Sequence, residues 1–323
     1  MAIRILYECS DYPHASGGVR RLYRHVDILR RHGLDAVMLH HKLGFRPAWF
    51  AHDVPIEYWT EDFRFTPDDI LVIPEGHAGV MRRTVDCGCE RVVIALNWAN
   101  IYKQLEIGTD WRTFGITHVI AGSQYEQHFV RQSMGLDSTV LASGTDTDLF
   151  KETGPKALQI AYMPRKNPKV FQTIAGIFRS RFPEWAHVPF VSIDEVPHDE
   201  VAHLMSASAI FLATSYPEGL ARPPLEAMAS GCIVVGFAGR GSLEYMHHGV
   251  NCYRADDLDM LTAAEYLDLA LRSLADSSAA AMKAAARETA TRYTLEREEA
   301  AVTAYWQSML AARQPQTMNA ACQ

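Results

Sequence analysis

The sequence of 323 residues lacks the cysteine patterns that bind structural metals or build disulfide frameworks. Its six cysteines form no C-x-x-C pair, and Cys87 and Cys89 make only a C-x-C spacing. We therefore expect free or buried thiols in a reducing cytosol. A broad nucleic-acid surface is also unexpected, because the formal net charge is −7.

Long hydrophobic runs are absent as well. No stretch of about 18 uninterrupted apolar residues occurs, so the sequence predicts no membrane-spanning helix. The N-terminal stretch "MAIRILYECS" enters a short apolar strand without the longer apolar region of a signal peptide. We expect a cytoplasmic protein; peripheral contact with the inner membrane face and the oligomeric state are left open.

The chain does contain short apolar runs that alternate with amphipathic segments. "IRILYECS", a glycine-containing loop, the helical pattern of residues 19–33 and "LDAVMLHH" make a βαβ unit, which predicts a parallel sheet. A second series of strands and helices begins after a polar linker. We therefore predict an α/β fold with two domains, residues 1–150 and 151–294. Residues 295–323 would form a helix that could cross back to the first domain, then a disordered tail from residue 313.

Glycines and cations follow the strands at which ligands usually bind, because open parallel sheets bind ligands at the carboxyl ends of their strands. Gly17 and Gly18 lie after the first strand and just ahead of a helix, where an anion could approach the backbone. A tight turn without a ligand explains them as well. Arg165, Lys166 and Lys169 follow the first strand of the second half and suit a diphosphate, or form a solvated surface cluster.

Two glutamates stand eight positions apart in "YPEGLARPPLEAMASG", at Glu218 and Glu226. A proline pair suits the first turn of a helix, and Gly231 would end that helix. We expect Glu218 in the loop before the helix and Glu226 in its first turn. Carboxylates accept hydrogen bonds from hydroxyl groups, which suits ribose and sugar rings. The alternative for Glu226 is a favourable interaction with the helix dipole.

This stretch resembles the E-x7-E signature of retaining glycosyltransferase family 4. Members of that family have the GT-B fold, in which two Rossmann-like domains face each other across a cleft. The resemblance extends over about residues 1–295 and includes four more segments: "HVIAGS", "ASGTDTDLF", "PRKNPK" and "GRGSLEYMHHGVNCY". The pair of glycines after the first strand also matches. The sequence departs from the family's "EGFGLP" at Ala221 and Arg222, which leaves the donor open.

The resemblance implies a role for each matching residue. Glu226 would bind the ribose hydroxyls, and Glu218 would lie near the hydroxyls of the donor sugar. Arg165 and Lys169 would hold the diphosphate as leaving group, with Lys166 as the alternative to Lys169. His77, in "VIPEGHAG", is the candidate for an active-site histidine of the N-terminal domain, the alternative being a polar surface residue. Further donor contacts are implied for Gly17, Gly18, Gly219, Leu220 and Leu225.

The implied activity is transfer of a hexosyl or deoxyhexosyl group from a nucleotide-diphosphate sugar to a hydroxyl group of a glycan, a lipid-linked molecule or a small molecule. No acidic pair lies in a convincing metal-binding context, so we expect neither a metal nor another cofactor; cations and helix N-termini would neutralise the leaving diphosphate. The alternative is a catalytically silent subunit or regulator that binds a sugar nucleotide. A Rossmann oxidoreductase is a more distant alternative, because the glycine loop lacks G-x-G-x-x-G.

The first predicted helix carries five arginines in an otherwise acidic chain: Arg20, Arg21, Arg24, Arg30 and Arg31. This basic face predicts a side that meets an acceptor or an anionic membrane. A solvated helix face is the alternative.

Overall fold

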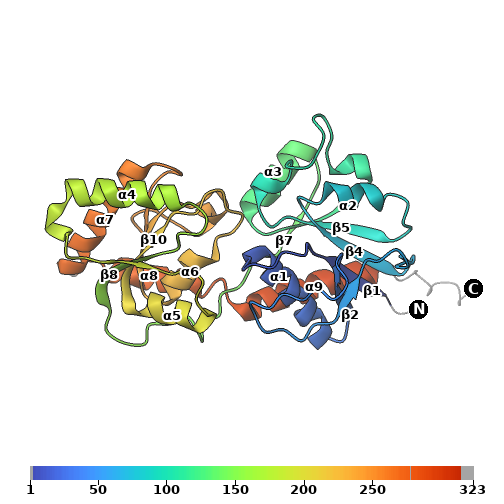
Figure 1. Ribbon diagram of the computed structural model, residues 1–323, viewed down its shortest axis with the longest axis horizontal. Helices are drawn as coiled ribbons and strands as arrows, with labels where there is room; N and C mark the ends of the chain where they lie inside the picture. Colours follow the sequence, from blue (N-terminus) through green and yellow to red (C-terminus); the bar gives the residue numbers. More distant parts are fainter. Residues whose placement is uncertain (1–2, 277, 314–323) are drawn as a thin grey trace, which may run out of the picture.

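The computed structural model describes residues 3–276 and 278–313, which form two α/β domains side by side (Figure 1). Within these residues the N-terminal domain holds a seven-stranded sheet of order β3-β2-β1-β4-β5-β6-β7, and the C-terminal domain holds a five-stranded sheet of order β12-β11-β10-β8-β9. Every neighbouring pair is parallel. This confirms the predicted class of two Rossmann-like, parallel-sheet domains.

The elements of the N-terminal domain, in chain order, are β1 (Arg4–Glu8), α1 (Gly17–Arg31), β2 (Asp35–His40), β3 (Ile56–Tyr58), β4 (Asp69–Pro74), α2 (Ala78–Arg83), β5 (Glu90–Ile94), the 3-10 helices η1 (Trp98–Asn100) and η2 (Trp111–Phe114), β6 (His118–Ala121), α3 (Gln124–Met134) and β7 (Thr139–Val140).

The elements that follow are β8 (Ala157–Tyr162), α4 (Pro168–Arg181), the 3-10 helix η3 (Pro183–Trp185), β9 (Phe190–Ser192), α5 (His198–Ala207), β10 (Ser208–Ala213), α6 (Arg222–Ala229), β11 (Ile233–Gly236), the 3-10 helix η4 (Gly241–Glu244), β12 (Tyr253–Arg254), α7 (Met260–Ala275), α8 (Ala280–Ala290) and α9 (Leu295–Arg313).

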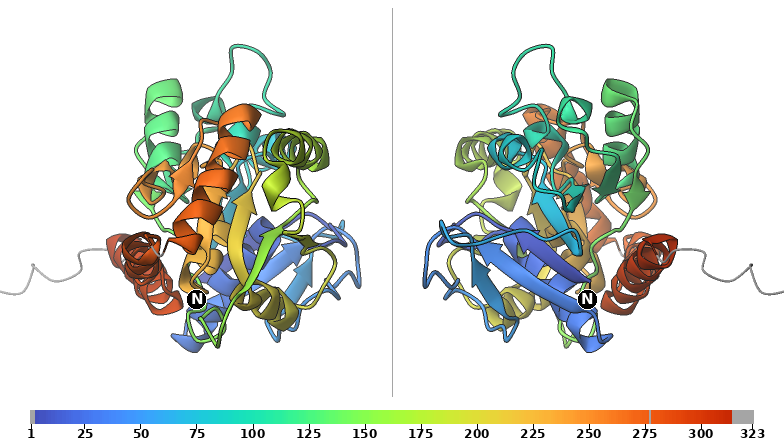
Figure 2. Two further views of the ribbon diagram at one scale, coloured as in Figure 1. Left: turned by 90° about the vertical axis from the view of Figure 1, so that its left-hand side faces the viewer. Right: turned by 90° about the vertical axis from the view of Figure 1, so that its right-hand side faces the viewer.

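Helices cover both faces of each sheet, as the view along the long axis shows (Figure 2). In β1, Ile5 and Tyr7 join a cluster with residues of α1 and α9, whereas Leu6 joins a cluster with residues of α2 and α3. Strands that are buried on two faces need apolar side chains on both, which explains the near-continuous apolar runs in the sequence. The carboxyl ends of both sets of strands point to the boundary between the domains, where the loops after β1, β4, β8 and β10 line one cavity.

Several boundaries differ from those predicted. Neither β3 nor α2 was predicted, because a three-residue strand and a six-residue helix show too little periodicity. Helix α1 begins at Gly17, since the side chain of Ser16 caps it by accepting the N–H of Val19.

Helix α6 begins at Arg222, one residue ahead of the proline pair. Glu226 therefore lies in the second turn, and the prediction that it occupies the first turn is wrong. Its distance from the free N–H groups removes the alternative reading of Glu226 as a dipole partner, because that effect is confined to the first turn.

Helix α9 lies against α1 of the N-terminal domain, although it follows the C-terminal domain in the chain (Figure 1). Trp306 is fully buried among the side chains under α1, and its Nε1–H donates to the hydroxyl oxygen of Tyr7 across 3.1 Å. Arg24 of α1 donates to the buried carboxylate of Glu298 across 2.7 Å. The chain therefore crosses the domain boundary twice.

The tail that we predicted to be disordered lies outside the described residues from 314 onward. Arg313 is the last residue of α9 and pairs with Glu90 at 2.7 Å. Across residues 3–276 and 278–313, none of the helices combines the length and apolarity that a membrane crossing requires.

The first prediction concerns the attachment of α9. Trp306→Ala should lower the free energy of unfolding of the N-terminal domain by about 3–5 kcal/mol, because a buried indole leaves a large cavity. Urea denaturation followed by circular dichroism measures this. Gln307→Ala, at an exposed position on the same helix, is the control and should change stability by less than about 0.5 kcal/mol. Equal stability of the two variants would show that α9 is not part of this core.

Candidate functional site

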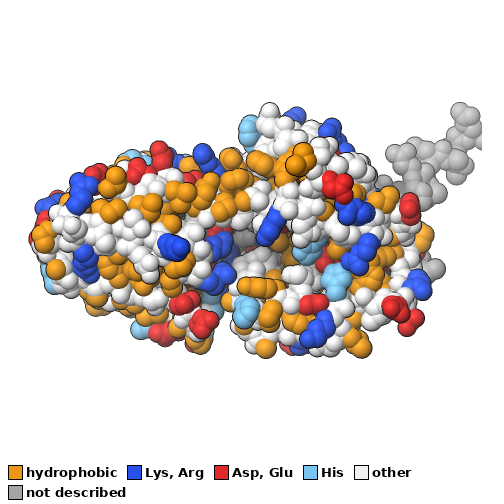
Figure 3. Space-filling view, turned by 45° about the horizontal axis from the view of Figure 1, so that its top comes forward, with side chains coloured by type: hydrophobic (Ala, Val, Ile, Leu, Met, Phe, Trp, Pro, Cys, Tyr) orange, Lys and Arg blue, Asp and Glu red, His pale blue; other side chains and the backbone are white. Residues whose placement is uncertain are grey.

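A cavity of about 550 Å³ lies between the two domains and is lined by residues from both. Its volume is within the range of about 300–1,000 Å³ that is usual for small-molecule sites. Lysine and arginine side chains gather around the hollow between the two halves (Figure 3). The loops that follow the strands bring these side chains together from segments that are far apart in the sequence.

The N-terminal wall of the cavity is the start of α1. Gly17 and Gly18 are the first two residues of this helix, and both line the cavity. The backbone is accessible here because glycine carries no side chain, and the free N–H groups of a helix start attract anions. A Cβ on Gly18 would lie 3.2 Å from Leu96 Cδ1, so close packing also favours glycine at this position.

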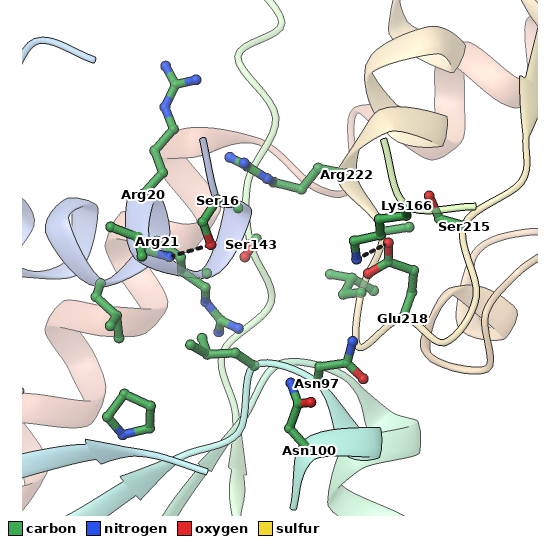
Figure 4. Close-up of a pocket in the computed structure, with 18 of the residues that line it drawn as sticks. Ser16, Arg20, Arg21, Asn97, Asn100, Ser143, Lys166, Ser215, Glu218 and Arg222 are labelled. Atoms are coloured by element: carbon green, nitrogen blue, oxygen red, sulfur yellow. Dashed lines mark hydrogen bonds and ion pairs between the residues drawn. The ribbon is translucent and has the colours of Figure 1, made fainter. Parts of the chain in front are cut away.

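The C-terminal wall is formed by the loop after β10 and by α6. Glu218 is fixed through its backbone: its N–H donates to Gly239 O across 3.0 Å, and its carbonyl oxygen accepts from Gly241 N across 3.2 Å. Its carboxylate accepts a hydrogen bond from Lys166 Nζ, as the dashed line in Figure 4 marks. Glu226 is buried on α6, and its Oε1 lies 4.0 Å from Nε2 of His198.

The three predicted cations of the second half differ in position. Arg165 and Lys166 line the cavity, whereas Lys169 lies in the first turn of α4, is exposed and is not among the lining residues. Of the other residues that the resemblance implied, Leu220 lines the cavity. Leu225 is fully buried in the core of its domain, and Gly219 is buried against the N-terminal domain.

His77 lines the cavity from the N-terminal side and caps the start of α2. Its Nδ1 lies 2.6 Å from Oε2 of Glu8, and its side chain is only 25% exposed. His77 is therefore a partly buried, hydrogen-bonded residue at the cavity rather than a freely exposed surface histidine.

Three more arginines line the cavity: Arg20 and Arg21 of the predicted basic face, and Arg222, at which the sequence departs from the family. Arg222 reaches from the start of α6 toward Ser16 and Arg20 at the start of α1 (Figure 4). Its guanidinium has no hydrogen-bond or ion-pair partner within the part of the chain that the structure describes. Arg20 Nη2 lies 3.2 Å from His198 Nδ1, and burial followed by repulsion from Arg222 lowers the pKa of Arg20. An arginine without a partner, such as Arg222, suits a bound anion.

The five arginines of the predicted basic face of α1 lie in different surroundings, and Arg30 and Arg31 are exposed. Arg24 pairs with Glu298 at 2.7 Å and Arg31 with Glu299 at 2.6 Å, both on α9. Arg30 pairs with Asp35 at 3.0 Å. Arg20 and Arg21 face the cavity instead. Arg24 and Arg31 therefore help to hold α9, and Arg20 and Arg21 help to line the cavity, whereas contact of this face with a membrane stays a prediction.

Buried acids hold the loops that meet the C-terminal domain. Glu75 accepts the backbone N–H groups of Leu96 and Asn97, each across 3.0 Å. The loop so fixed contacts the other domain, since Asn97 Nδ2 donates to Pro217 O across 3.1 Å. Glu126 accepts the N–H of Gly122 across 2.6 Å, and its Oε1 faces Gly219. Burial, and then the charge of Glu75, raises the pKa of Glu126 to about 8.

No group of three or more histidine, cysteine, aspartate or glutamate side chains is arranged to hold a metal ion within residues 3–276 and 278–313. The groups available to neutralise a diphosphate at the cavity include the arginines, Lys103, Lys166 and the start of α1.

Comparison with known proteins agrees with this geometry. Residues 186–289, which include Glu218 and Glu226, match the family model described as glycosyl transferases group 1. An alpha-1,6-glucosyltransferase of Actinobacillus pleuropneumoniae serotype 7 is 28% identical over 248 residues, which make up 72% of this chain and 72% of that protein. These two similarities support a glycosyltransferase.

Two solved structures have a similar fold. Sucrose-phosphate synthase from Thermosynechococcus elongatus has a TM-score of 0.73 at 15% identity, covering 96% of this chain and 100% of that one. HepE from Anabaena in complex with UDP-glucose has a TM-score of 0.68 at 16% identity, covering 95% of this chain and 100% of that one. At these identities the likeness establishes the fold, which is GT-B.

The second prediction follows from Glu126. Its carboxyl group has a pKa of about 8 in the folded protein but about 4.3 in an unfolded chain, so the folded state binds the proton more tightly. Protonation of Glu126 therefore stabilises the folded state. This contribution to the free energy of unfolding is fully present below about pH 4.3 and is lost as the pH rises through about 8. Glu126→Gln, which can still accept the N–H of Gly122, should remove this dependence and make the protein more stable than wild type at alkaline pH.

Urea denaturation at a series of pH values measures this difference. Glu106→Gln, whose carboxylate is 74% exposed in the same domain, is the control and should follow the wild-type curve. A constant difference between wild type and Glu126→Gln across the pH range would contradict the prediction.

Proposed function

We propose that this protein is a retaining, metal-independent glycosyltransferase that moves a hexose from a nucleotide-diphosphate sugar to a hydroxyl group. One observation carries the proposal. Two carboxylates and three cations of the C-terminal domain line the same cavity as the glycine start of α1 and His77 of the N-terminal domain. The carboxylates can bind the hydroxyl groups of ribose and sugar, while the cations and helix start can bind the two phosphates.

In this proposal Glu226 binds the ribose, and Arg165 and Lys169 hold the diphosphate. The position of Lys166 on the cavity wall makes it at least as good a candidate as Lys169. Glu218 binds hydroxyl groups of the donor sugar. Glu218 accepts a hydrogen bond from Lys166, so this pair can contact the sugar and the adjacent phosphate together.

The diphosphate departs with negative charge, and cations already in place stabilise that charge without a metal ion. Arg20 and Arg222 add positive charge on the side of α1.

UDP-glucose is the donor that we propose first. The relative from Actinobacillus is named as a glucosyltransferase, and HepE, which shares the fold, was solved with UDP-glucose. The acceptor class that we propose is a glycan, either free or carried by a lipid.

A ligand screen followed by a turnover assay tests the proposed function. UDP, GDP, ADP and dTDP are compared by thermal shift, because a ligand that binds only the folded state raises the melting temperature. UDP-glucose is then incubated in EDTA, and release of UDP is followed with and without oligosaccharide acceptors. Release of UDP and a product that keeps the anomeric configuration, read by NMR, are expected. Binding without any turnover would instead favour the silent sugar-nucleotide-binding subunit.

The third prediction separates the two glutamates. Glu218→Gln should lower kcat by roughly ten- to a hundredfold, about 1.4–2.8 kcal/mol, with little change in UDP affinity, because its contact strengthens as the sugar gains positive charge. Glu226→Ala should mainly weaken UDP binding. Glu184→Gln, at the surface of the same domain, is the control. Calorimetry and steady-state kinetics measure the two effects; a fully active Glu218→Gln would refute this division of roles.

A further inference from the structure

A second cavity of about 500 Å³ adjoins the first on the N-terminal domain. The two cavities share Ser10, His77 and Gln104 in their walls. A molecule in the second cavity would therefore meet a donor sugar beside His77. The groups that set the protonation and the orientation of the His77 ring can then influence the transfer step.

Glu8 is the residue that holds His77. It ends β1, its side chain is completely buried, and its two oxygens each contact one histidine. Oε2 lies 2.6 Å from Nδ1 of His77, and Oε1 lies 2.7 Å from Nε2 of His41. Because a carboxylate oxygen only accepts hydrogen bonds, both of these ring nitrogens must carry protons. Nε2 of His77, on the opposite edge of the ring, has no partner among the described residues.

A relay of hydrogen bonds behind Glu8 keeps it in place. The backbone N–H of His41 donates to Asp11 Oδ1 across 3.3 Å, and the same oxygen lies 3.0 Å from Nδ1 of His40. Nε2 of His40 lies 2.8 Å from the hydroxyl group of Tyr23. The ring of His41 stacks on Trp59. These contacts leave Glu8 little freedom to turn away from His77.

We propose that Glu8 is a positioning residue for sugar transfer: it binds the Nδ1–H of His77 and so presents the Nε2–H of His77 to a sugar hydroxyl group at the junction of the two cavities. This inference rests on the proposed function. His77 would then act as a doubly protonated donor, charged through its contact with a buried carboxylate. Neither the loop of Glu218 nor the phosphate-binding cations take part in this arrangement.

The electrostatics agree with this geometry. Burial opposes ionisation of Glu8, but the bonds from His41 and His77 outweigh it and lower the pKa of Glu8. Burial likewise opposes protonation of His77, but the hydrogen bond and charge of Glu8, with a further contribution from Glu75, raise the pKa of His77. The other charged groups that line the two cavities near His77 are Asp11 of the loop after β1, Arg82 and Arg83 of α2, and Lys103 of the loop after η1.

The pH dependence of transfer tests the proposal. As the pH rises through the pKa of His77, the proton on Nε2 is lost, because Glu8 retains the one on Nδ1. Transfer should therefore decline on the alkaline side. Glu8→Gln keeps an oxygen that accepts the Nδ1–H but removes the negative charge, so the pKa of His77 should fall. The alkaline limb, which is the decline of the transfer rate at high pH, should then move to lower pH by about one unit or more. In His77→Gln this limb should disappear.

The matched control is Glu298→Gln, which neutralises another buried carboxylate of the same domain, away from both cavities. It should lower the melting temperature without moving the alkaline limb. If the alkaline limb of Glu8→Gln lies at the same pH as that of the wild-type protein, the proposal is overturned. A shift confined to the acidic limb would also overturn it, since that would make His77 a base.

A spectroscopic measurement covers the case in which Glu8→Gln does not fold. The ring ¹⁵N signals of His77 in the wild-type protein are identified by their absence in His77→Gln. Nδ1 should stay protonated throughout the titration, with Nε2 as the nitrogen that loses its proton; the opposite tautomer would overturn the proposal. This result does not depend on activity, so it is distinct from failure of the proposed function, which would appear as a wild-type protein that transfers no sugar.

Discussion

The close approach of Gly219 to the N-terminal domain is the constraint on which the site depends. A Cβ at this position would lie 2.2 Å from Oε1 of Glu126 and 2.4 Å from the carbonyl oxygen of Leu96, distances that no side chain can occupy. Glycine alone therefore lets the loop of Glu218 reach this depth. Next to it, Trp98 Nε1 donates to Gly239 O across 3.2 Å. These contacts place the C-terminal carboxylates opposite the start of α1.

Buried carboxylates provide the support for the N-terminal wall. Glu8 ends β1, Glu75 follows β4 and Glu126 lies in the first turn of α3, and all three are almost completely shielded from water. Each one fixes a segment at the carboxyl edge of the sheet: the ring of His77, the loop at Leu96, and the turn before α3. The charged groups that face the cavity are mostly cations, whereas the acids beneath them are structural. This separation leaves the cavity attractive to a diphosphate.

Much of the fold and part of the site could be predicted from the sequence. Alternating apolar runs predicted both parallel sheets, and the spacing of Glu218 and Glu226 marked the C-terminal wall. Glu8 could not be recognised, because it is the last residue of an apolar strand and its partners lie 33 and 69 positions away. Arg24 and Arg31 of α1 could not be assigned either, since their partners belong to α9, about 270 positions later.

The turnover of a donor sugar by Gly219→Ala tests most directly whether the reaction requires the two domains to meet as they do here. The added methyl group must push the loop of Glu218 away from Leu96, and a displacement of about 1 Å can cost roughly a hundredfold in rate. Gly176→Ala is the control, because a Cβ there meets nothing within 4 Å. We predict that release of UDP from UDP-glucose falls about a hundredfold in Gly219→Ala and is unchanged in Gly176→Ala. Wild-type turnover in a folded Gly219→Ala variant would contradict the account.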